Sequence, residues 1–416
     1  MRFSTVCLVL SGIAFVMAGE AWAAEKAAEP DFNSKLYAAH FTGLAGDFET
    51  ATASFEELLS INSQEPIIYL FYADILEIAG DFARAAGVLD RGLAAARFAG
   101  PEIEEGIREK IRRLGEKRKF REAMEDGLPW KDARLFTGTG FVVRTNMPVS
   151  YFEPVARRIA SLLAAEQEML AGILGETQRL PPTMSIIILG RFEDHQAFVR
   201  ERAAEGKPPL VMVPDAYYDP VTREMIIFFD GASDWTKIAH EMVHFLIREL
   251  YLENPSSFLD EGLADYIAYK VEKADAKMEL IARLNTINFL YDQGQWGFAM
   301  DLFTHWENYT RAFQRVSLIS NLQSNRRAYL DNYVRYTPVK RMFYLSAWAM
   351  THFFLEGGDE RLENFFRQYI AYEKSRGFDD FHTARNYFRT ELGEEGIRAL
   401  DAAWGRYTIG LTYDTV

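Results

Sequence analysis

Residues 238–246 read IAHEMVHFL, and a second stretch, FLDEGLADY, follows at residues 258–266. His240 and His244 are four residues apart, so a helix places them on one face with their Cβ atoms about 6 Å apart. One metal ion can then contact both imidazole rings at roughly 2.0–2.1 Å. The first stretch therefore predicts a helix that carries two ligands of a metal ion.

The second stretch predicts a returning helix that completes the metal site. Glu261 lies near the start of this stretch, and Ser256 or Ser257 can cap a helix that begins just before it. Because such a helix returns antiparallel after a short loop, it can bring the Glu261 carboxylate back over the two imidazoles. Asp265, one turn further on, faces the same way and can accept the outer N–H of a ligating histidine.

Glu241 follows the first histidine of the motif and is the candidate for acid–base chemistry. A catalytic zinc site has three protein ligands and keeps a fourth position for water. Glu241 points toward the same side of the helix without being a ligand, so it can take a proton from that water. The alternative is a solvated helix, with Glu261 a surface carboxylate at a helix start. Asp260 is expected to be an exposed acid of the first turn of the returning helix.

HEMVH followed by FLDEGLADY resembles the gluzincin metallopeptidases, most closely the secreted bacterial peptidase-MA-like group, in which W/F-L-x-E-G-x-A-x-Y carries the third ligand. The resemblance implies a thermolysin-like metallopeptidase domain with a small α/β lobe and a helical lobe. It implies a Zn²⁺ cofactor bound by His240, His244 and Glu261. Glu241 is then the general base and acid. The resemblance also implies a sheet-edge strand that pairs with an extended peptide substrate, for which Met225–Phe229 is the candidate.

The segment RMFYLSAWAMTHFFL, residues 341–355, resembles a helical segment in which related aminopeptidases have a tyrosine within a YxxGA-like motif. By that resemblance Tyr344 is the candidate donor to the carbonyl oxygen, which gains negative charge during amide hydrolysis. The match departs at Ala347 and Trp348, where the relatives have glycine and alanine. The alternative is that Tyr344 is a buried tyrosine in an aromatic-rich core, since 14% of the residues are aromatic.

Residues 1–23 predict a cleaved secretory signal peptide. Arg2 supplies a basic start, residues 5–18 are apolar, and Ala21-Trp22-Ala23 is a small-x-small cleavage signal. An uncleaved anchor is the alternative, but the apolar core is shorter than the about 20 residues of a membrane span. Cys7 is the only cysteine, and no later stretch is long and apolar enough to cross a bilayer. We therefore expect a disulfide-free periplasmic or secreted protein.

An internal repeat predicts a helical module at residues 24–128. AGDF occurs at residues 45–48 and again at 79–82, and this interval equals the period of tetratricopeptide repeats. Residues 32–98 thus resemble two tetratricopeptide units, which usually leave a concave face for a protein partner. The alternative is a plain array of helical hairpins that packs on the rest of the chain. The charged stretch at 102–126 is expected to be a solvated helix.

The rest of the chain predicts an α/β lobe at residues 129–232 and a helical lobe at 233–416. The apolar and β-branched runs that are typical of strands lie at 141–145, 184–190, 210–214 and 224–231, the last two as a hairpin. A helical stretch near 150–175 separates the first two runs. The expected fold is α+β and mostly helical.

These features together predict an exported zinc metallopeptidase that acts on peptides or proteins, with a protein partner for its N-terminal repeats. The net charge of −14 excludes nucleic acid as a partner, because binding it requires a basic surface. Two alternatives stay open. The protein is a non-catalytic repeat scaffold with a structural or vestigial zinc site, or it is a zinc amidase that acts on cell-wall peptides.

Overall fold

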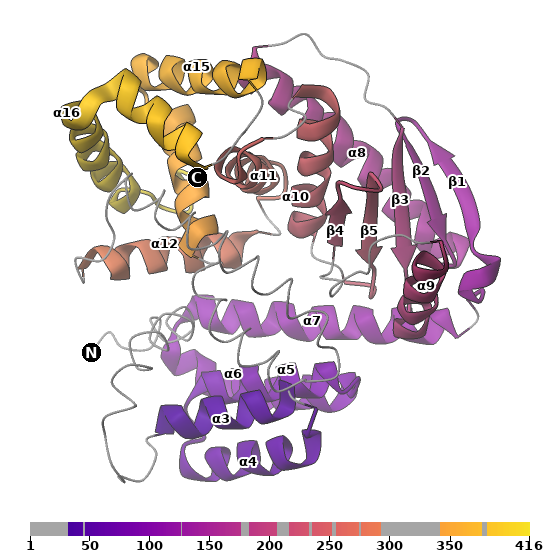
Figure 1. Ribbon diagram of the computed structural model, residues 1–416. Coiled ribbons are helices and arrows are strands. Elements are labelled where there is room, and N and C mark those ends of the chain that lie inside the picture. The colour runs from indigo at the N-terminus through magenta and orange to yellow at the C-terminus, as the bar shows by residue number, and fades with distance from the viewer. Residues whose placement is uncertain are drawn as a thin grey trace. The chain divides into compact units, whose positions relative to one another are not determined.

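The described part of the chain forms two compact units (Figure 1). The computed structural model describes residues 32–44, 46–125, 127–175, 183–205, 216–232, 235–251, 255–273, 276–292, 342–376 and 381–416. The first unit holds the described residues up to Ala123 together with Asp230–Ala232, and the second holds the others. The expected signal peptide and the apolar run at 210–214 lie outside the described residues. Within the described ranges, no helix has the length and apolar character that a membrane span requires.

The described part of the first unit contains the helices α3 (Phe32–Leu44), α4 (Phe48–Ile61), α5 (Pro66–Ile78), α6 (Phe82–Ala99) and α7 (Pro101–Met124). The interval between the two AGDF motifs also separates the start of α3 from that of α5, and the start of α4 from that of α6. Each AGDF motif supplies a helix cap, because Asp47 and Asp81 accept the backbone N–H groups of Thr50 and Arg84, both at 3.1 Å. The repeat is therefore a repeated helical hairpin.

The core of the first unit uses equivalent positions of the two hairpins. Ala51 and Phe55 of α4 are fully buried, as are their counterparts Ala85 and Leu89 of α6. The Phe55 ring stacks on Tyr72 of α5 with centroids 5.2 Å apart. Small and large apolar residues one turn apart thus let the helices pack closely.

The charged helix α7 differs from the solvated helix that the sequence predicted. Its Ile107 and Leu114 are buried and belong to the core of the first unit. Lys117 donates to Glu77 of α5 at 2.6 Å. The alternating charges mask an apolar stripe, since isoleucine and leucine recur among them at helical spacing.

The second unit contains one mixed sheet of five strands among its described residues: β1 (Arg134–Gly138), β2 (Phe141–Thr145), β3 (Met184–Leu189), β4 (Ala216–Asp219) and β5 (Glu224–Phe228). The strand order is β1-β2-β3-β5-β4, with β2, β3 and β5 parallel and the outer pairs antiparallel. The strands expected at 141–145, 184–190 and 224–231 are confirmed. The partner of β5 in the hairpin is β4. Neither β4 nor β1 was predicted from the sequence.

The predicted edge strand at Met225–Phe229 is wrong. Among the described strands β5 lies between β3 and β4, so the edge on that side of the sheet is β4. Met225, Ile226 and Ile227 are all buried, and such a continuous apolar run belongs to a strand that is covered on both faces. The edge strand is instead the shorter and more polar Ala216–Asp219, which Pro220 follows.

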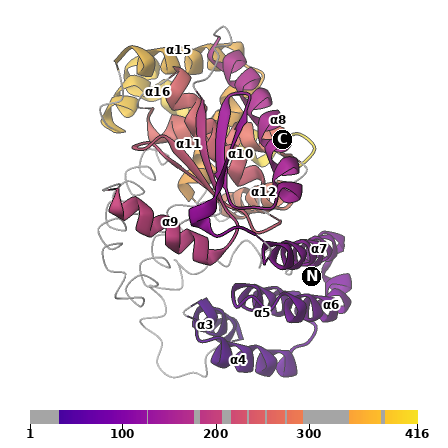
Figure 2. The same ribbon diagram turned by 90° about the vertical axis from the view of Figure 1, so that its right-hand side faces the viewer.

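Helices α8 (Val149–Leu174) and α9 (Phe192–Ala204) lie on opposite faces of this sheet, as both ribbon views show (Figures 1 and 2). Ile187 and Leu189 of β3 point to the α9 face and form a cluster with Phe198. On the α8 face, Phe136 of β1 stacks on Phe152 with centroids 4.1 Å apart. The helix expected near 150–175 is confirmed as α8.

The remaining described segments of the second unit are helical, and the fold is therefore α+β and mostly helical, as predicted. They are α10 (Trp235–Leu246), the π-helical turn η2 (Ile247–Tyr251), α11 (Ser257–Val271), α12 (Lys277–Asp292), a helix at 342–356, α15 (Glu360–Arg376) and α16 (Phe381–Ile409). The expected cap of α11 is confirmed, because the Ser256 hydroxyl accepts the N–H of Leu259 at 3.3 Å.

Candidate metal centre

Helix α10 carries the HEMVH motif as predicted, and its apolar residues pack into the core. Ile238, Met242 and Val243 are buried, which leaves the two histidines facing the neighbouring helix α11. The Nε2 atoms of His240 and His244 are 3.0 Å apart, and their rings are nearly perpendicular, with centroids separated by 4.6 Å. Two imidazole nitrogens thus converge on one point.

Glu261 of α11 brings a carboxylate oxygen to the same point. Its Oε2 lies 3.1 Å from His240 Nε2 and 3.4 Å from His244 Nε2. His240, Glu241 and His244 also each offer a ligand atom within 4.8 Å of one another. Glu261 is the better candidate for the third ligand, because its oxygen approaches both Nε2 atoms, whereas the Oε2 atom of Glu241 accepts another hydrogen bond.

The outer nitrogen of each imidazole is bound to its own aspartate. His240 Nδ1 lies 2.8 Å from Asp265 Oδ1, and His244 Nδ1 lies 2.8 Å from Asp260 Oδ1. Because a carboxylate accepts the Nδ1–H, both Nε2 lone pairs are directed inward when the rings are neutral. Two imidazoles and a carboxylate whose free electron pairs converge form a donor set that fits Zn²⁺.

The expectation that Asp260 is an exposed first-turn acid is wrong. Asp260 is only 5% exposed and pairs with His244. Adjacent residues of a helix point about 100° apart, so Asp260 reaches the outer side of one imidazole while Glu261 reaches its inner side. The sequence signal for this contact is the adjacent pair Asp260 and Glu261 at the start of the returning helix.

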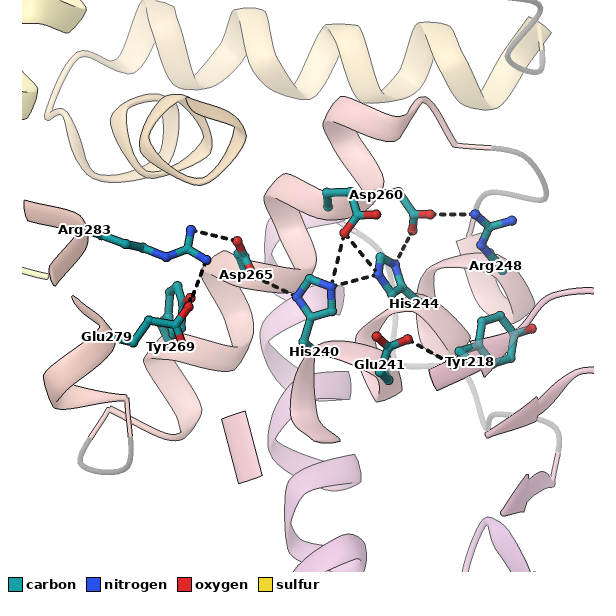
Figure 3. A network of polar contacts seen from close by, with 11 residues as sticks. Tyr218, His240, Glu241, His244, Arg248, Asp260, Asp265, Tyr269, Glu279 and Arg283 are labelled. Atoms are coloured by element: carbon teal, nitrogen blue, oxygen red, sulfur yellow. Dashed lines mark hydrogen bonds and ion pairs between the residues drawn. The ribbon is translucent and has the colours of Figure 1, made fainter. Parts of the chain in front are cut away.

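Two arginines extend the network beyond the aspartates. Arg283 Nη1 lies 2.9 Å from Asp265 Oδ2, and Arg248 Nη2 donates to Asp260 Oδ2 at 2.6 Å. Figure 3 shows the two chains of contacts leaving the paired imidazoles in opposite directions. Arg248 follows His244 by four residues, a helical spacing that indicates their proximity. No spacing along the chain indicates that Arg283 of α12 lies near the site.

The electrostatics of the site follow from burial and from the mutual contacts of its groups. Burial acts to lower the pKa of His240, but Asp265 and Glu261 outweigh it and raise that pKa to about 9. The pKa of His244 is raised well above its usual value, because Asp260 and Glu261 overcome the effect of burial. Burial acts to raise the pKa of Glu261, but both imidazoles hold it well below its usual value. The carboxylates therefore favour positive charge at the imidazole pair, from a proton or from a cation.

These shifts predict a pH optimum for the stability of the metal-free protein. A raised histidine pKa stabilises the fold fully below the unfolded value of 6.5, and this is lost as pH rises through about 9. The lowered pKa of Glu261 contributes above its usual 4.5 and is lost as pH falls. In chelator-treated protein, we expect Tm to peak between about pH 4.5 and 6.5 and to fall by on the order of 5 °C as the pH rises through about 9. Thermal scans across this range that show a flat Tm exclude this coupling.

Glu241 lies between the imidazole pair and the edge strand of the sheet. Its Oε2 accepts the backbone N–H of Tyr218 in β4 at 2.8 Å. Burial raises the pKa of Glu241, and the imidazoles of His244 and His240 only partly offset this. A carboxylate with a raised pKa is suited to accepting and returning a proton near neutral pH. This contact with Tyr218 joins β4 to α10, and no sequence motif indicates that the two segments meet.

Tyr344 lies beside the imidazole pair. Its ring centroid is 6.0 Å from that of His240, and the planes are tilted by 32°. The helix at 342–356 approaches α11 closely at Gly262, where a Cβ atom would lie 2.9 Å from the Ala347 carbonyl oxygen and 2.4 Å from Thr351 Oγ1. The resemblance departs at Ala347, where the relatives have glycine. The glycine at this close crossing is instead Gly262 of α11.

Replacing Gly262 by alanine is therefore expected to destabilise the second unit by about 1–3 kcal/mol, because backbone as well as side chain must move. Gly172 of α8 is the matched control, since nothing lies within 4 Å of a Cβ there. Gly172→Ala should stabilise by up to about 1 kcal/mol through helix propensity alone. Urea unfolding of both variants measures the difference, and equal effects would exclude a tight crossing at Gly262.

Comparisons of the chain with protein-family models, with curated proteins and with solved structures found no match. The function is therefore inferred from the residues and the geometry of the site.

Proposed function

We propose that the protein is an exported zinc-dependent metallopeptidase. The observation that supports this most directly is the convergence of His240 Nε2, His244 Nε2 and Glu261 Oε2 within 3.4 Å of one another. Imidazole nitrogens and a carboxylate oxygen are the ligands of catalytic zinc sites in hydrolases. The N-terminal repeats are proposed to bind a protein partner or substrate, and residues 1–23 to direct export to the periplasm or exterior.

Each residue of the site has a role in this proposal. His240, His244 and Glu261 hold the metal ion. Zn²⁺, when bound, lowers the pKa of a coordinated water to about 7 and polarises the scissile carbonyl group. Glu241 accepts the proton of the attacking water and later donates it to the leaving amine. Tyr344, beside His240, is the candidate hydrogen-bond donor to the carbonyl oxygen as negative charge develops on it.

The substrate is proposed to be an extended peptide that adds to the outer edge of β4. This edge replaces Met225–Phe229 as the candidate, because β4 is the outermost strand on that side among the described residues. Backbone pairing with an edge strand binds many sequences, since it uses the amide groups and not the side chains. The Tyr218 N–H is bonded to Glu241, so a peptide that adds to β4 beside this contact would pass close to the proposed general base.

Metal removal tests this function. The mature chain is incubated with an unfolded protein, and the fragments are analysed by mass spectrometry with and without a zinc chelator. We expect internal or terminal cleavage that stops with the chelator and returns when Zn²⁺ is added in excess of it. Cleavage that is indifferent to the chelator, or a zinc-loaded chain that cleaves no peptide bond, would contradict the proposal and favour a scaffold or an amidase of narrower substrate range.

A further inference from the structure

Arg283 of α12 is joined to the metal-ligand candidate His240 through one carboxylate. Asp265 Oδ1 lies 2.8 Å from His240 Nδ1, and Asp265 Oδ2 lies 2.9 Å from Arg283 Nη1. One oxygen of the aspartate therefore has a hydrogen bond to the imidazole, and the other forms an ion pair with the guanidinium, without hydrogen-bond geometry. Figure 3 shows the three side chains in a row. The carboxylate cannot turn about its last bond without weakening both contacts.

The guanidinium of Arg283 is itself held in place. Its central carbon lies 4.8 Å from the centroid of the Tyr269 ring and 5.9 Å from that of Trp348. Arg283 Nη2 donates to Glu279 Oε1 at 3.2 Å, and the Tyr269 hydroxyl donates to the same oxygen at 2.7 Å. A planar guanidinium held by aromatic rings and by carboxylates on two sides has little freedom to reorient.

Burial makes this contact strong. The side chain of Arg283 is 14% exposed and that of Asp265 is 7% exposed. Inside a protein a charge pair is weakly screened, and removing one partner leaves the other buried without compensation. A histidine that donates its outer N–H to a fixed carboxylate keeps its ring orientation and tautomer, which supports metal affinity.

We infer that Arg283 is a positioning residue: it fixes Asp265, and through Asp265 it holds the His240 ring with Nε2 directed at the cation. This inference rests on the proposed function, because it concerns the same metal site. Arg283 contacts neither substrate nor metal in this assignment. Its effect is transmitted by one carboxylate to one imidazole, so the loss of Arg283 should disturb His240 and leave His244 in place.

The second arm of the network provides an internal comparison. Arg248 pairs with Asp260, which holds His244, but the Arg248 side chain is 27% exposed. Solvent screens such a pair more strongly. Arg283→Met should therefore weaken metal binding more than Arg248→Met does, although both variants remove one arginine that lies two contacts away from a ligating imidazole.

Metal affinity is the first readout. Zn²⁺ affinity is measured by competition with a chromophoric chelator for wild type, Arg283→Met, Arg283→Lys and two controls. We expect about a 10-fold loss for Arg283→Met, at the lower end of what outer partners of a ligand contribute, with partial recovery in Arg283→Lys. The controls are Arg361→Met and Arg389→Met, which change exposed arginines that pair with Asp359 and Glu394. Both controls should stay within about twofold of wild type, because neither alters the contact with Asp265.

The second readout does not need the metal. In ¹⁵N-labelled metal-free protein, NMR resolves the ring nitrogens and the hydrogen-bonded Nδ1–H of each histidine. Arg283→Met should shift and broaden the His240 Nδ1–H signal while the His244 signal stays unchanged. Arg283→Lys decides the question if the methionine variant fails to fold. An unchanged His240 signal together with unchanged Zn²⁺ affinity in a folded variant would overturn the inference. Wild type that binds no metal would instead refute the proposed function, while the NMR result still tests Arg283.

Discussion

Replacing Glu241 by glutamine is expected to slow peptide hydrolysis by about 10³-fold, within the range of a lost general base. The substitution removes the proton acceptor and changes little else. Glutamine has the same shape, and its amide oxygen can still accept the Tyr218 N–H that now bonds to Glu241 Oε2. The three ligand atoms of His240, His244 and Glu261 are untouched, so zinc content should remain that of wild type.

The measurement combines initial rates of peptide cleavage with metal analysis of the same samples. Glu249→Gln is the matched control, because Glu249 lies two helical turns further on and contacts Arg223 and the Tyr218 hydroxyl instead of the imidazoles. It should retain a rate close to wild type. A Glu241→Gln variant that cleaves at the wild-type rate while holding zinc would remove Glu241 from the mechanism.

Replacing Glu261 by alanine is expected to weaken zinc binding by more than the about 100-fold that an outer partner of a ligand can supply. The reason is the position of its Oε2, which lies 3.1 and 3.4 Å from the two Nε2 atoms. Without it, two imidazoles alone face the cation. The negative charge that balances the cation is also lost, and hydrolysis should disappear together with the metal.

Zinc titration by calorimetry with a competing chelator measures this loss. Glu363→Ala is a suitable control, since it removes a carboxylate that pairs with Arg367 on the surface of α15. Its zinc affinity should equal that of wild type. If Glu261→Ala bound zinc as tightly as Glu363→Ala, the third ligand would have to be another group, and Glu241 would be the first to examine because of its proximity to both histidines.

Local signals in the sequence were sufficient for the parts of the site that lie on two consecutive helices. The i, i+4 spacing places His240 and His244 on one face, and a serine cap starts the returning helix at Ser256. Glu261 and Asp265 are then one turn apart on that helix, and the structure brings both to the imidazoles. Helical geometry decides these contacts once the two helices are antiparallel.

Contacts that depend on the packing of distant segments were not predictable in the same way. Arg283 belongs to another helix, and Tyr218 belongs to a strand that precedes the motif, so no spacing along the chain indicates either contact. The edge strand was misassigned for a related reason. Strand order depends on which segments meet in space. The apolar run at Met225–Phe229 indicates that this strand is buried, but it does not indicate the position of the strand in the sheet.

The N-terminal unit illustrates the opposite case. The interval between two four-residue motifs predicted repeated helical units, and in the structure each aspartate of AGDF caps the helix that follows it. The charged stretch after the repeats was harder to interpret. Its ionic residues dominate the composition, but Ile107 and Leu114 decide which side of α7 is buried.

The central claim is that two imidazoles and one distant carboxylate bind the same cation, and anomalous diffraction tests it most directly. Crystals of zinc-loaded protein are measured on both sides of the zinc absorption edge. We expect one strong anomalous peak at roughly 2.0–2.2 Å from His240 Nε2, His244 Nε2 and Glu261 Oε2. A Glu261 carboxylate turned away from both rings, or no peak between them at saturating zinc, would contradict the claim.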